Sequence, residues 1–507
     1  MDKFLTDQNI LKVVKEIKKN HKIVLCHGIF DLLHVGHIEY FEEAKKNGDI
    51  LIVSLTEDKF INKGPNRPHF NNANRLKSIS ALSIVDYVYL NKSFTANSII
   101  RLIKPDFYVK GPDYKNTKDD LTKNINKEIS EVKKYGGKYV VTKGQTYSSS
   151  NIINSSFSEL SESQSKLLKI IKIKYKTFDK IKLKIEELLK KKILIIGEAI
   201  IDNYIFCEAL GKASKDLHIN IKKLNEEMYL GGTLSIAKNL SDYCNNISLL
   251  SFIGRKKEHL GFIKKNLNKN IHTNFLTKSN SSTILKTRYL DDIDKIKFIG
   301  VYDFNDSEIN KIEEKKFINL IKNKGNKSDL IIITDYNHGI ITTKVSEFIS
   351  SKFKHRFNLN CQLNSSNMRF KALDKYKYPN LVIINETELR YEFRDKETKI
   401  ETLAKRLIYK LKINHLLITS GRRGMTYFKK SSNKKIHLDA FSDYAVDKVG
   451  AGDTVLAFFS IFFNFNFGIE LSMLLSSLAA RHSVRNIANK NSYLKKDMLT
   501  HLHYLLK

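Results

Sequence analysis

Short apolar runs alternate with amphipathic segments from Lys22 to about Ser150, and this alternation limits most strongly how the chain can fold. The runs read KIVLC, ILIVSL, YVYL, FYVKG and KYVVTKG, and the segments between them read HIEYFEEAKKNG, NANRLKSISALS, NSIIRLIK and KEISEVKKYGG. Strands joined through helices pair in parallel, because a crossover helix returns the chain to the edge at which it started. The pattern therefore predicts an α/β domain with a parallel sheet, whose ligands bind at the carboxyl ends of the strands.

A second α/β pattern begins at Lys192, after a segment of different composition. Its apolar runs are KILIIGEAIIDNY, LIIITDY, LVIINETE and HLLITSGRRGMTYF, and helices follow VGAGDTVLAFF. The preceding NSSFSELSESQSK is polar, and the LLKIIKIKYKTFDKIKLKIEELLKKK after it has the pattern of an amphipathic helix. We predict a first domain over 1–155, a linker with an amphipathic helix over 156–190, and a second domain over 191–507. A length of 507 residues fits two or three cores.

The formal net charge of +33 raises the question of a nucleic-acid partner, since clustered Lys and Arg bind polyphosphates through counterion release. The lysines are instead spread along the whole chain beside abundant Asn and Ile, which favours compositional bias. The sequence therefore predicts no nucleic-acid partner, although a positive field attracts nucleotides and sugar phosphates. The alternative, a basic nucleic-acid-binding protein, predicts that the basic residues gather on one face.

The cysteines and the apolar segments predict a cytoplasmic protein without a membrane partner. The four cysteines are far apart and have neither metal-ligand spacing nor the pattern of a disulfide framework. The stretch MDKFLTDQNILKVVKEIKKN is amphipathic and lacks the apolar core of a signal peptide. The most apolar segment, Val455 to Ala480, is interrupted by polar residues, so we expect a buried helix pair there and not a membrane span.

Two histidines beside a glycine-containing turn form the first candidate site. The stretch CHGIFDLLHVGH places His34 and His37 one helical turn apart, where a helix is expected to begin. The free backbone N–H groups and the dipole of a helix N-terminus favour an anion there, and Gly28 and Gly36 permit its close approach. Nucleotidyl transfer needs this arrangement, because its catalysis consists mostly of positioning and of stabilising charge on the phosphoryl oxygens.

GIFDLLHVGH resembles the HxGH signature of the cytidylyltransferase-like nucleotidyltransferases, which implies a Rossmann-like fold. The likeness continues through KGPNRP, NANRLKSISAL, KPDFYVKGPDY, KYGGKYVV and YSSSNII, and is closest to the bifunctional heptose-7-phosphate kinase/heptose-1-phosphate adenylyltransferases. It implies that His34 and His37 contact phosphate and transition state and that Lys63 is a cation on the triphosphate. The further nucleotide- and phosphate-binding positions that it implies are Gly28, Phe30, Gly36, Arg75, Lys110, Asp113, Ser148, Ser149 and Ser150.

The stretch DKVGAGDTV is the second candidate site. Gly450 and Gly452 permit a tight turn whose N–H groups converge at a helix N-terminus and can hold a migrating phosphoryl group. Asp453, held in that turn, can accept the proton of a sugar hydroxyl as it attacks. The motif therefore predicts phosphoryl transfer to a sugar.

The second half resembles the ribokinase-like (PfkB) carbohydrate kinases from about Lys192 to residue 507. The resemblance implies that Asn385 and Glu388 organise Mg²⁺ indirectly. The nucleotide- or phosphate-binding positions that it implies are Thr419, Gly421, Gly424, Gly450, Ala451 and Gly452. The sugar-binding positions that it implies are Asp202, Gly231, Gly232, Ser235, Lys286 and Arg288.

Three departures from the heptose kinase pattern lie on the sugar side of the expected site. Ser235 replaces an amide, His338 replaces a lysine, and Gln362, Leu363 and Asn364 replace an Asp-Pro-Lys strand end. They indicate a different sugar phosphate or, as the alternative, a kinase half that has lost its activity. The transferase also precedes the kinase, an order inverted relative to that family.

The sequence thus predicts a bifunctional enzyme of nucleotide-sugar synthesis. The C-terminal domain would phosphorylate a sugar or sugar phosphate from ATP with Mg²⁺. The N-terminal domain would transfer a nucleotidyl group from ATP or CTP to a sugar-1-phosphate and release pyrophosphate. By analogy with both families, we also expect a homodimer. The alternative is an active nucleotidyltransferase beside an inactive kinase-like domain.

Overall fold

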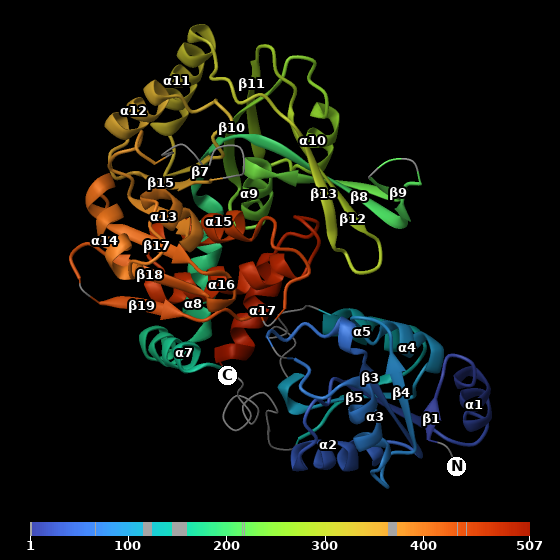
Figure 1. Cartoon of the computed structure of the whole chain (residues 1–507). Helices are drawn as coiled ribbons and strands as arrows, with labels where there is room; N and C mark the ends of the chain where they lie inside the picture. The colour runs from blue at the N-terminus through green and yellow to red at the C-terminus, as the bar shows by residue number, and fades with distance from the viewer. Residues whose placement is uncertain are drawn as a thin grey trace. The chain divides into compact units, whose positions relative to one another are not determined.

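The computed structural model describes residues 3–65, 67–114, 124–143, 160–214, 216, 218–363, 373–432, 434–442 and 444–506 (Figure 1). The chain forms two compact units. The first contains residues 1–160 together with 496–507, and the second contains residues 161–495. Residues 496–507, which the sequence placed in the second domain, thus group with the first unit.

Six parallel strands form the sheet of the first unit, in the order β1-β4-β3-β2-β5-β6. The strands are β1 (Phe4–Leu5), β2 (Ile23–Gly28), β3 (Ile50–Thr56), β4 (Tyr87–Asn91), β5 (Phe107–Lys110) and β6 (Lys138–Val141). The predicted parallel sheet is confirmed. From β2 the chain builds outward through β3 and β4 and then returns to the other side through β5 and β6. The carboxyl ends of β2 and β5 therefore flank the crevice in which such sheets bind ligands.

Helices cover both faces of this sheet because its strands alternate their side chains between two apolar clusters. The helices are α1 (Ile10–Ile17), α2 (Val35–Lys45), α3 (Asn72–Ser80), α4 (Asn97–Ile103) and α5 (Asn124–Lys134). One more helix, α17 (Lys495–Leu506), belongs to this unit from residue 496 on. Ile23 and Leu25 of β2 pack with residues of α1, α4 and α5. Val24 and Cys26, on the opposite face, pack with residues of α2 and α3. A shift of one residue would exchange the two sets, so this burial fixes the register of the strand.

The second unit has a nine-stranded sheet in the order β11-β10-β7-β14-β15-β16-β17-β18-β19 and a four-stranded sheet in the order β13-β12-β8-β9. The large sheet consists of β7 (Lys192–Gly197), β10 (Asn246–Gly254), β11 (Ile271–Lys278), β14 (Leu330–Asp335), β15 (Phe357–Cys361), β16 (Leu381–Asn385), β17 (His415–Thr419), β18 (Met425–Lys429) and β19 (Lys435–Leu438). All its neighbours pair in parallel except β18 and β19, which form antiparallel pairs at one edge. The small sheet consists of β8 (Ala199–Lys212), β9 (Ile219–Gly231), β12 (Ile284–Asp291) and β13 (Lys297–Asp303).

Two groups of helices sandwich the nine-stranded sheet. One group packs in a single large apolar cluster and lies along one side of the sheet in Figure 1: α11 (Lys311–Gly325), α12 (Thr343–Lys352), α13 (Glu386–Phe393) and α14 (Ile400–Leu411). The other helices are α7 (Glu162–Tyr175), α8 (Phe178–Glu187), α9 (Gly232–Leu240), α10 (Leu260–Asn266), α15 (Ala451–Asn464) and α16 (Ile469–Val484). The expected linker helix is two helices, α7 and α8, of the second unit, and α7 begins with a capping box between Ser161 and Gln164.

The apolar segment from 455 to 480 forms most of α15 and α16, two packed helices whose residues are mostly buried. The expected helix pair is confirmed. Within the described ranges, no helix has both the length and the apolar content needed to cross a bilayer.

Candidate active sites

The paired histidines of the first unit lie where β2 passes into α2. His34 is the N-cap of α2, and its ring stacks on that of His37 with 3.9 Å between centroids. The ring of Phe30 meets His37 edge to face at 5.3 Å. Burial lowers the pKa of His34, and burial together with the charges of His34 and Lys63 lowers the pKa of His37 to about 3. Both imidazoles are therefore neutral near pH 7 and offer N–H donors to a phosphate.

Lys63 supplies a positive charge near the histidines. Burial and the neighbouring Arg67 lower the pKa of Lys63 to about 8, while Asp31 and Asp113 oppose this shift. Asp31 lies 3.6 Å from the Arg67 guanidinium and accepts hydrogen bonds from the backbone N–H groups of His69 and Phe70. We did not single out Asp31 and Arg67 from the sequence, although both lie inside motifs that carry the family resemblance, IFDLLH and KGPNRP.

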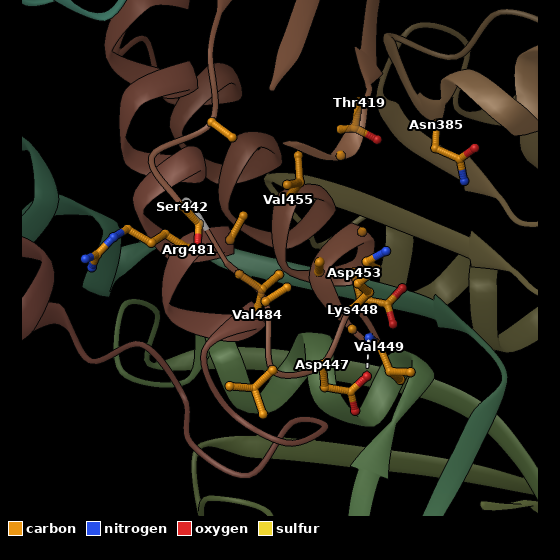
Figure 2. Close-up of a pocket in the computed structure, with 18 of the residues that line it drawn as sticks. Asn385, Thr419, Ser442, Asp447, Lys448, Val449, Asp453, Val455, Arg481 and Val484 are labelled. Atoms are coloured by element: carbon orange, nitrogen blue, oxygen red, sulfur yellow. Dashed lines mark hydrogen bonds between the residues drawn. The ribbon is translucent and has the colours of Figure 1, made fainter. Parts of the chain in front are cut away.

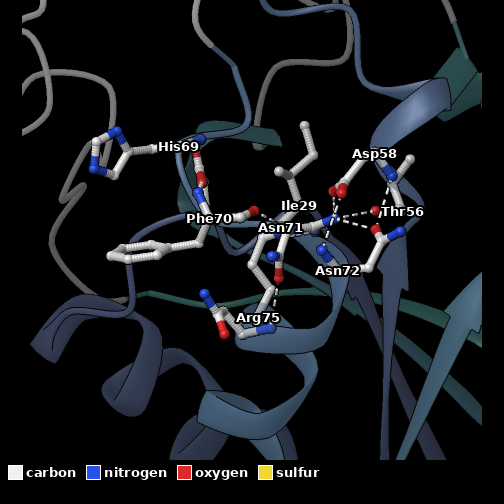
Figure 3. A network of polar contacts seen from close by, with 10 residues as sticks. Ile29, Thr56, Asp58, His69, Phe70, Asn71, Asn72 and Arg75 are labelled. Atoms are coloured by element: carbon white, nitrogen blue, oxygen red, sulfur yellow. Dashed lines mark hydrogen bonds and ion pairs between the residues drawn. The ribbon is translucent and has the colours of Figure 1, made fainter.

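Arg75 holds the scaffold of this site together. Its side chain is 1% exposed and lies at the centre of the network in Figure 3. The guanidinium donates to five acceptors at 2.6–3.0 Å, which are the carbonyl oxygens of Ile29, Thr56 and Phe70 and the side chains of Asp58 and Asn72. The sequence placed Arg75 on the triphosphate. The structure instead uses it to join the loop after β2, the end of β3 and the start of α3.

Lys110 ends β5, on the other side of the crevice, and Asp113 follows this strand. The buried Lys110 ammonium donates to the carbonyl oxygen of His27 at 3.0 Å and lies 3.9 Å from the Glu128 carboxylate. Asp113 is exposed in a short 3-10 turn, Pro112–Tyr114. Ser148, Ser149 and Ser150 lie outside the described residues.

Helix α17 contributes to the surroundings of Lys63. The Lys63 ammonium lies 5.0 Å from the centroid of the Tyr504 ring. Asn62, the preceding residue, donates to Asp497 at 2.8 Å. No sequence motif pointed to these partners, which come from residues more than four hundred positions away.

The second unit encloses a cavity of about 730 Å³, seen in Figure 2. The large sheet, the small sheet and the start of α15 all line it. The predicted residues among its walls are Asp202, Gly232, Lys286, Arg288, Asn385, Glu388, Thr419, Gly421, Gly424, Gly450, Ala451, Gly452 and Asp453. Gly231 and Ser235 are not among the lining residues. Residues that are spread over two hundred and fifty positions of the chain thus converge on one cavity.

The turn before α15 requires glycine at position 450. Gly450 is the N-cap of α15 and has φ +83°. A Cβ atom there would lie 2.1 Å from the side-chain oxygen of Asn489. Asp447 braces the same turn by accepting the N–H of Val449 at 3.0 Å, the dashed bond in Figure 2, and accepts the Tyr204 hydroxyl at 2.6 Å. The backbone N–H groups that open α15 therefore face the cavity in a fixed conformation.

Asp453 lies in the first turn of α15 and has the electrostatic properties of a general base. Its Oδ1 accepts the Tyr336 hydroxyl at 2.6 Å. The pKa of Asp453 is raised to about 7, mainly by burial. The hydrogen bond from Tyr336 and the charge of Lys286 lower this pKa, and the charge of Asp202 raises it. A carboxylate with this pKa is about half ionised near pH 7 and accepts a proton more readily than an ordinary aspartate.

Asp202, Lys286 and Arg288 form the other wall. Arg288 donates to Asp202 at 2.5 Å, and burial lowers the pKa of Lys286. Gly231 lies behind Asp202, where a Cβ atom would be 2.3 Å from the carboxylate oxygen. Gly231 therefore acts by leaving room for Asp202.

Asn385 and Glu388 cap helix α13 and also face the cavity. Asn385 accepts the Glu388 backbone N–H at 2.8 Å, and Glu388 accepts the Asn385 N–H at 3.0 Å. Burial raises the pKa of Glu388 to about 7, and the charge of Asp453 adds to the rise. A buried carboxylate such as that of Glu388 suits a divalent cation, and Mg²⁺ commonly takes one or two carboxylates together with substrate phosphates. The described residues contain no cluster of three or more metal-binding side chains.

Two protein-family models match the chain. The model of the pfkB family carbohydrate kinases matches residues 190–485, more than half of the chain. The chain belongs to the pfkB family. The cytidylyltransferase-like family model matches residues 25–155. Helix α17 lies beyond both matches.

This pfkB family chain also resembles curated proteins and solved structures. It is 40% identical over 138 residues to the bifunctional protein HldE of Aliarcobacter butzleri, covering 25% of this chain and 29% of the relative. It is 40% identical over 129 residues to that of Helicobacter hepaticus, covering 25% and 26%. The matched parts span less than a third of these relatives. A mutant phosphofructokinase-2 from Escherichia coli has a TM-score of 0.50 at 13% identity, covering 62% of this chain and all of that structure, and supports the fold alone.

The departures from the heptose kinase pattern have different positions in this pfkB family chain. Ser235 is buried and donates to the Gly232 carbonyl inside α9 at 2.9 Å. His338 is 1% exposed and forms a hydrogen bond with the Asp306 carboxylate. It lines a separate, much smaller cavity. Gln362 lines the large cavity, and Asn364 lies outside the described residues. Of the described departures named here, Gln362 is therefore the one placed to touch a substrate in that cavity.

Proposed function

We propose that the chain is a bifunctional enzyme that phosphorylates a sugar or sugar phosphate and joins a nucleotidyl group to a sugar-1-phosphate. The observation that carries this proposal is the large cavity of the second unit, where the glycine turn, a carboxylate with a raised pKa and two cations face one space. The chain matches a carbohydrate kinase family and a cytidylyltransferase-like family, and its relatives are named bifunctional protein HldE. These matches support the pairing of the two reactions.

In the kinase unit, Asp453 takes the proton of the acceptor hydroxyl while that oxygen forms a bond to the γ-phosphorus of ATP. The bond between the γ-phosphorus and the bridging oxygen breaks, and ADP leaves. The N–H groups at the start of α15 hold the oxygens of the migrating group. Asp202 orients sugar hydroxyls, and Lys286 and Arg288 bind an anionic substituent.

Glu388 would hold Mg²⁺ together with the phosphates of ATP, and Asn385 would fix the Glu388 carboxylate through their shared cap. The ion supplies neutralisation of the charge on the β- and γ-phosphates. The raised pKa of Glu388 fits this role, because a bound cation favours the ionised carboxylate.

In the transferase unit, the phosphate of the sugar attacks the α-phosphorus of ATP or CTP, and pyrophosphate leaves. The neutral imidazoles of His34 and His37 donate hydrogen bonds to the phosphoryl oxygens, and Lys63 offsets the charge of the triphosphate. No protein nucleophile is required for this reaction.

The proposal is tested by mass spectrometry of the products after incubation with ATP, CTP and a panel of heptose and hexose phosphates. Formation of ADP with a newly phosphorylated sugar, abolished in Asp453→Asn, supports the kinase. If the wild type and Asp453→Asn are equally inert while pyrophosphate is still released, the kinase half is inactive and the alternative holds. If neither product forms with any substrate, the bifunctional proposal fails.

The homodimer and the absence of a nucleic-acid partner stay predictions. Size-exclusion chromatography with light scattering tests the first. Titration with DNA and RNA at two salt concentrations tests the second, because a polyphosphate partner gives a steep salt dependence.

A further inference from the structure

Tyr336 follows strand β14 and touches the proposed base of the kinase directly. Its side chain lines the large cavity, although the residue as a whole is 3% exposed. Its hydroxyl donates to Oδ1 of Asp453 at 2.6 Å, a short, charge-assisted bond. Tyr336 lies in the stretch DYNHG, in which the sequence pointed to His338 and not to the tyrosine.

The loop that carries Tyr336 is fixed from behind. Glu198, buried just after β7, accepts the backbone N–H of Tyr336 at 3.0 Å through one oxygen and that of His338 at 3.1 Å through the other. Asp335 accepts the N–H of Asn337 at 2.8 Å. Three successive N–H groups are thus held by buried carboxylates, so the phenol reaches Asp453 from a fixed backbone.

A second contact ties the same ring to the sugar side of the cavity. The Lys286 ammonium lies 5.7 Å from the centroid of the Tyr336 ring, within the range of a cation–π contact. The ring therefore touches both the proposed base and a cation that faces the acceptor.

We propose that Tyr336 is a positioning residue for Asp453, which fixes one carboxylate oxygen so that the other faces the acceptor hydroxyl. This inference rests on the proposed kinase activity. Because the phenol donates to the carboxylate, it also stabilises the ionised form of Asp453 and so lowers its pKa. Without the phenol, Asp453 would hold its proton to higher pH and would rotate more freely.

Other charged groups face Asp453 and set the background on which Tyr336 acts. They are Asp202 from β8, Lys286 from β12 and Glu388 from α13. Lys448 lies in the turn that leads into α15 and is exposed at the cavity. Replacing Tyr336 changes none of these side chains, so a shift in the pH profile reports the lost hydroxyl.

The decisive variant is Tyr336→Phe, which removes one oxygen and keeps the ring. We expect the acid limb of kcat/KM for the kinase to move up by about one pH unit. The variant should therefore be about tenfold slower than the wild type at pH 6 and within about twofold of it at pH 9. ADP formation is measured from pH 5.5 to 9.5 on the full chain, after thermal unfolding has shown that the variant is folded.

Tyr108→Phe is the matched control. Tyr108 is another buried tyrosine whose hydroxyl donates to a carboxylate, Oε2 of Glu128, at 2.8 Å, but it belongs to the first unit and does not line the cavity. It should lower the unfolding midpoint without moving the acid limb. A second variant, Glu198→Gln, weakens the hydrogen bonds that hold the backbone of Tyr336 and His338. It should move the acid limb of kcat/KM to higher pH, by less than Tyr336→Phe does.

The outcomes separate the inference from the function on which it rests. A wild type without kinase activity overturns the proposed function and this inference together. If the wild type is active but Tyr336→Phe has the same rate and the same acid limb as the wild type, Tyr336 does not position the base. If Tyr336→Phe does not fold, Glu198→Gln becomes the test. The inference is then overturned if the acid limb of kcat/KM in Glu198→Gln lies at the same pH as in the wild type.

Discussion

The two proposed sites would each hold a phosphate at the start of a helix, and they differ in their electrostatics. In the first unit, the groups with shifted pKa values at the site are the imidazoles of His34 and His37 and the ammonium of Lys63, all shifted downward. In the second unit they include Asp453 and Glu388, both shifted upward to about 7. Burial is the largest cause in each case.

This difference follows the chemistry that we propose for each site. A sugar phosphate that attacks a nucleotide is already an anion, so the transferase needs donors and cations but no base. A sugar hydroxyl carries a proton that must leave, so the kinase needs a carboxylate able to accept it near neutral pH. The comparison makes four predictions that can break or sharpen it.

The largest expected effect is the separate loss of each activity. Asp453→Asn should lower kcat of the kinase about 10²–10⁴-fold by removing the base. His37→Ala should lower pyrophosphate release about 10²–10³-fold by removing a donor to the transition state. Each variant serves as the control for the other, since both assays are run on the same preparation. A loss of both activities in either variant would contradict two independent sites.

Gly450→Ala should lower the free energy of unfolding by about 1–3 kcal/mol and reduce the kinase rate, because the residue has a positive φ and a crowded Cβ position. Gly452→Ala is the matched control for stability. Its Cβ position has no neighbour within 4 Å, so the change should stay within about 0.5 kcal/mol. Urea titrations measure both, and equal losses would refute the strained turn.

The two pH profiles should run in opposite directions. Asp453 works as a carboxylate with a pKa of about 7, so kcat/KM of the kinase should fall about tenfold per pH unit below 7. Lys63 works as a cation with a pKa lowered to about 8, so kcat/KM of the transferase for its nucleotide should fall above pH 8 as the ammonium loses its proton. Steady-state rates across pH 5.5–9.5 check both limbs, and parallel profiles would be the contrary result.

The smallest expected effect concerns helix α17. Tyr504→Ala removes the ring beside the Lys63 ammonium and should raise KM of the transferase for its nucleotide about two- to fivefold, the value of a weak cation–π contact. The kinase should be unaffected. An unchanged KM would show that the ring does not support Lys63.

The sequence was most informative where one short stretch carries both local structure and chemistry. The HxGH turn and the GAGD turn each combine glycine geometry with a helix start, so their positions and the α/β folds around them could be predicted. Contacts between residues that are distant in sequence could not be predicted. Arg75 lies in a recognisable motif, yet the five acceptors that surround it come from separate segments, and only their assembly shows that it is structural.

Side-chain direction set a second limit. Ser235 stands in a substrate motif, but its hydroxyl bonds its own helix. Tyr336 lies two residues before His338, but no sequence motif pointed to its contact with Asp453. The partners of both depend on strands and loops that are distant in sequence, and local pattern does not encode which way a side chain turns.

The position of α17 has a consequence for biosynthesis. Its residues emerge from the ribosome only after the whole of 161–495, yet they group with 1–160. The first unit therefore receives one of its helices only after the second unit has been synthesised. A chain interrupted anywhere in the second unit would carry a first unit without its final helix, which ties the maturation of one half to the completed synthesis of the other.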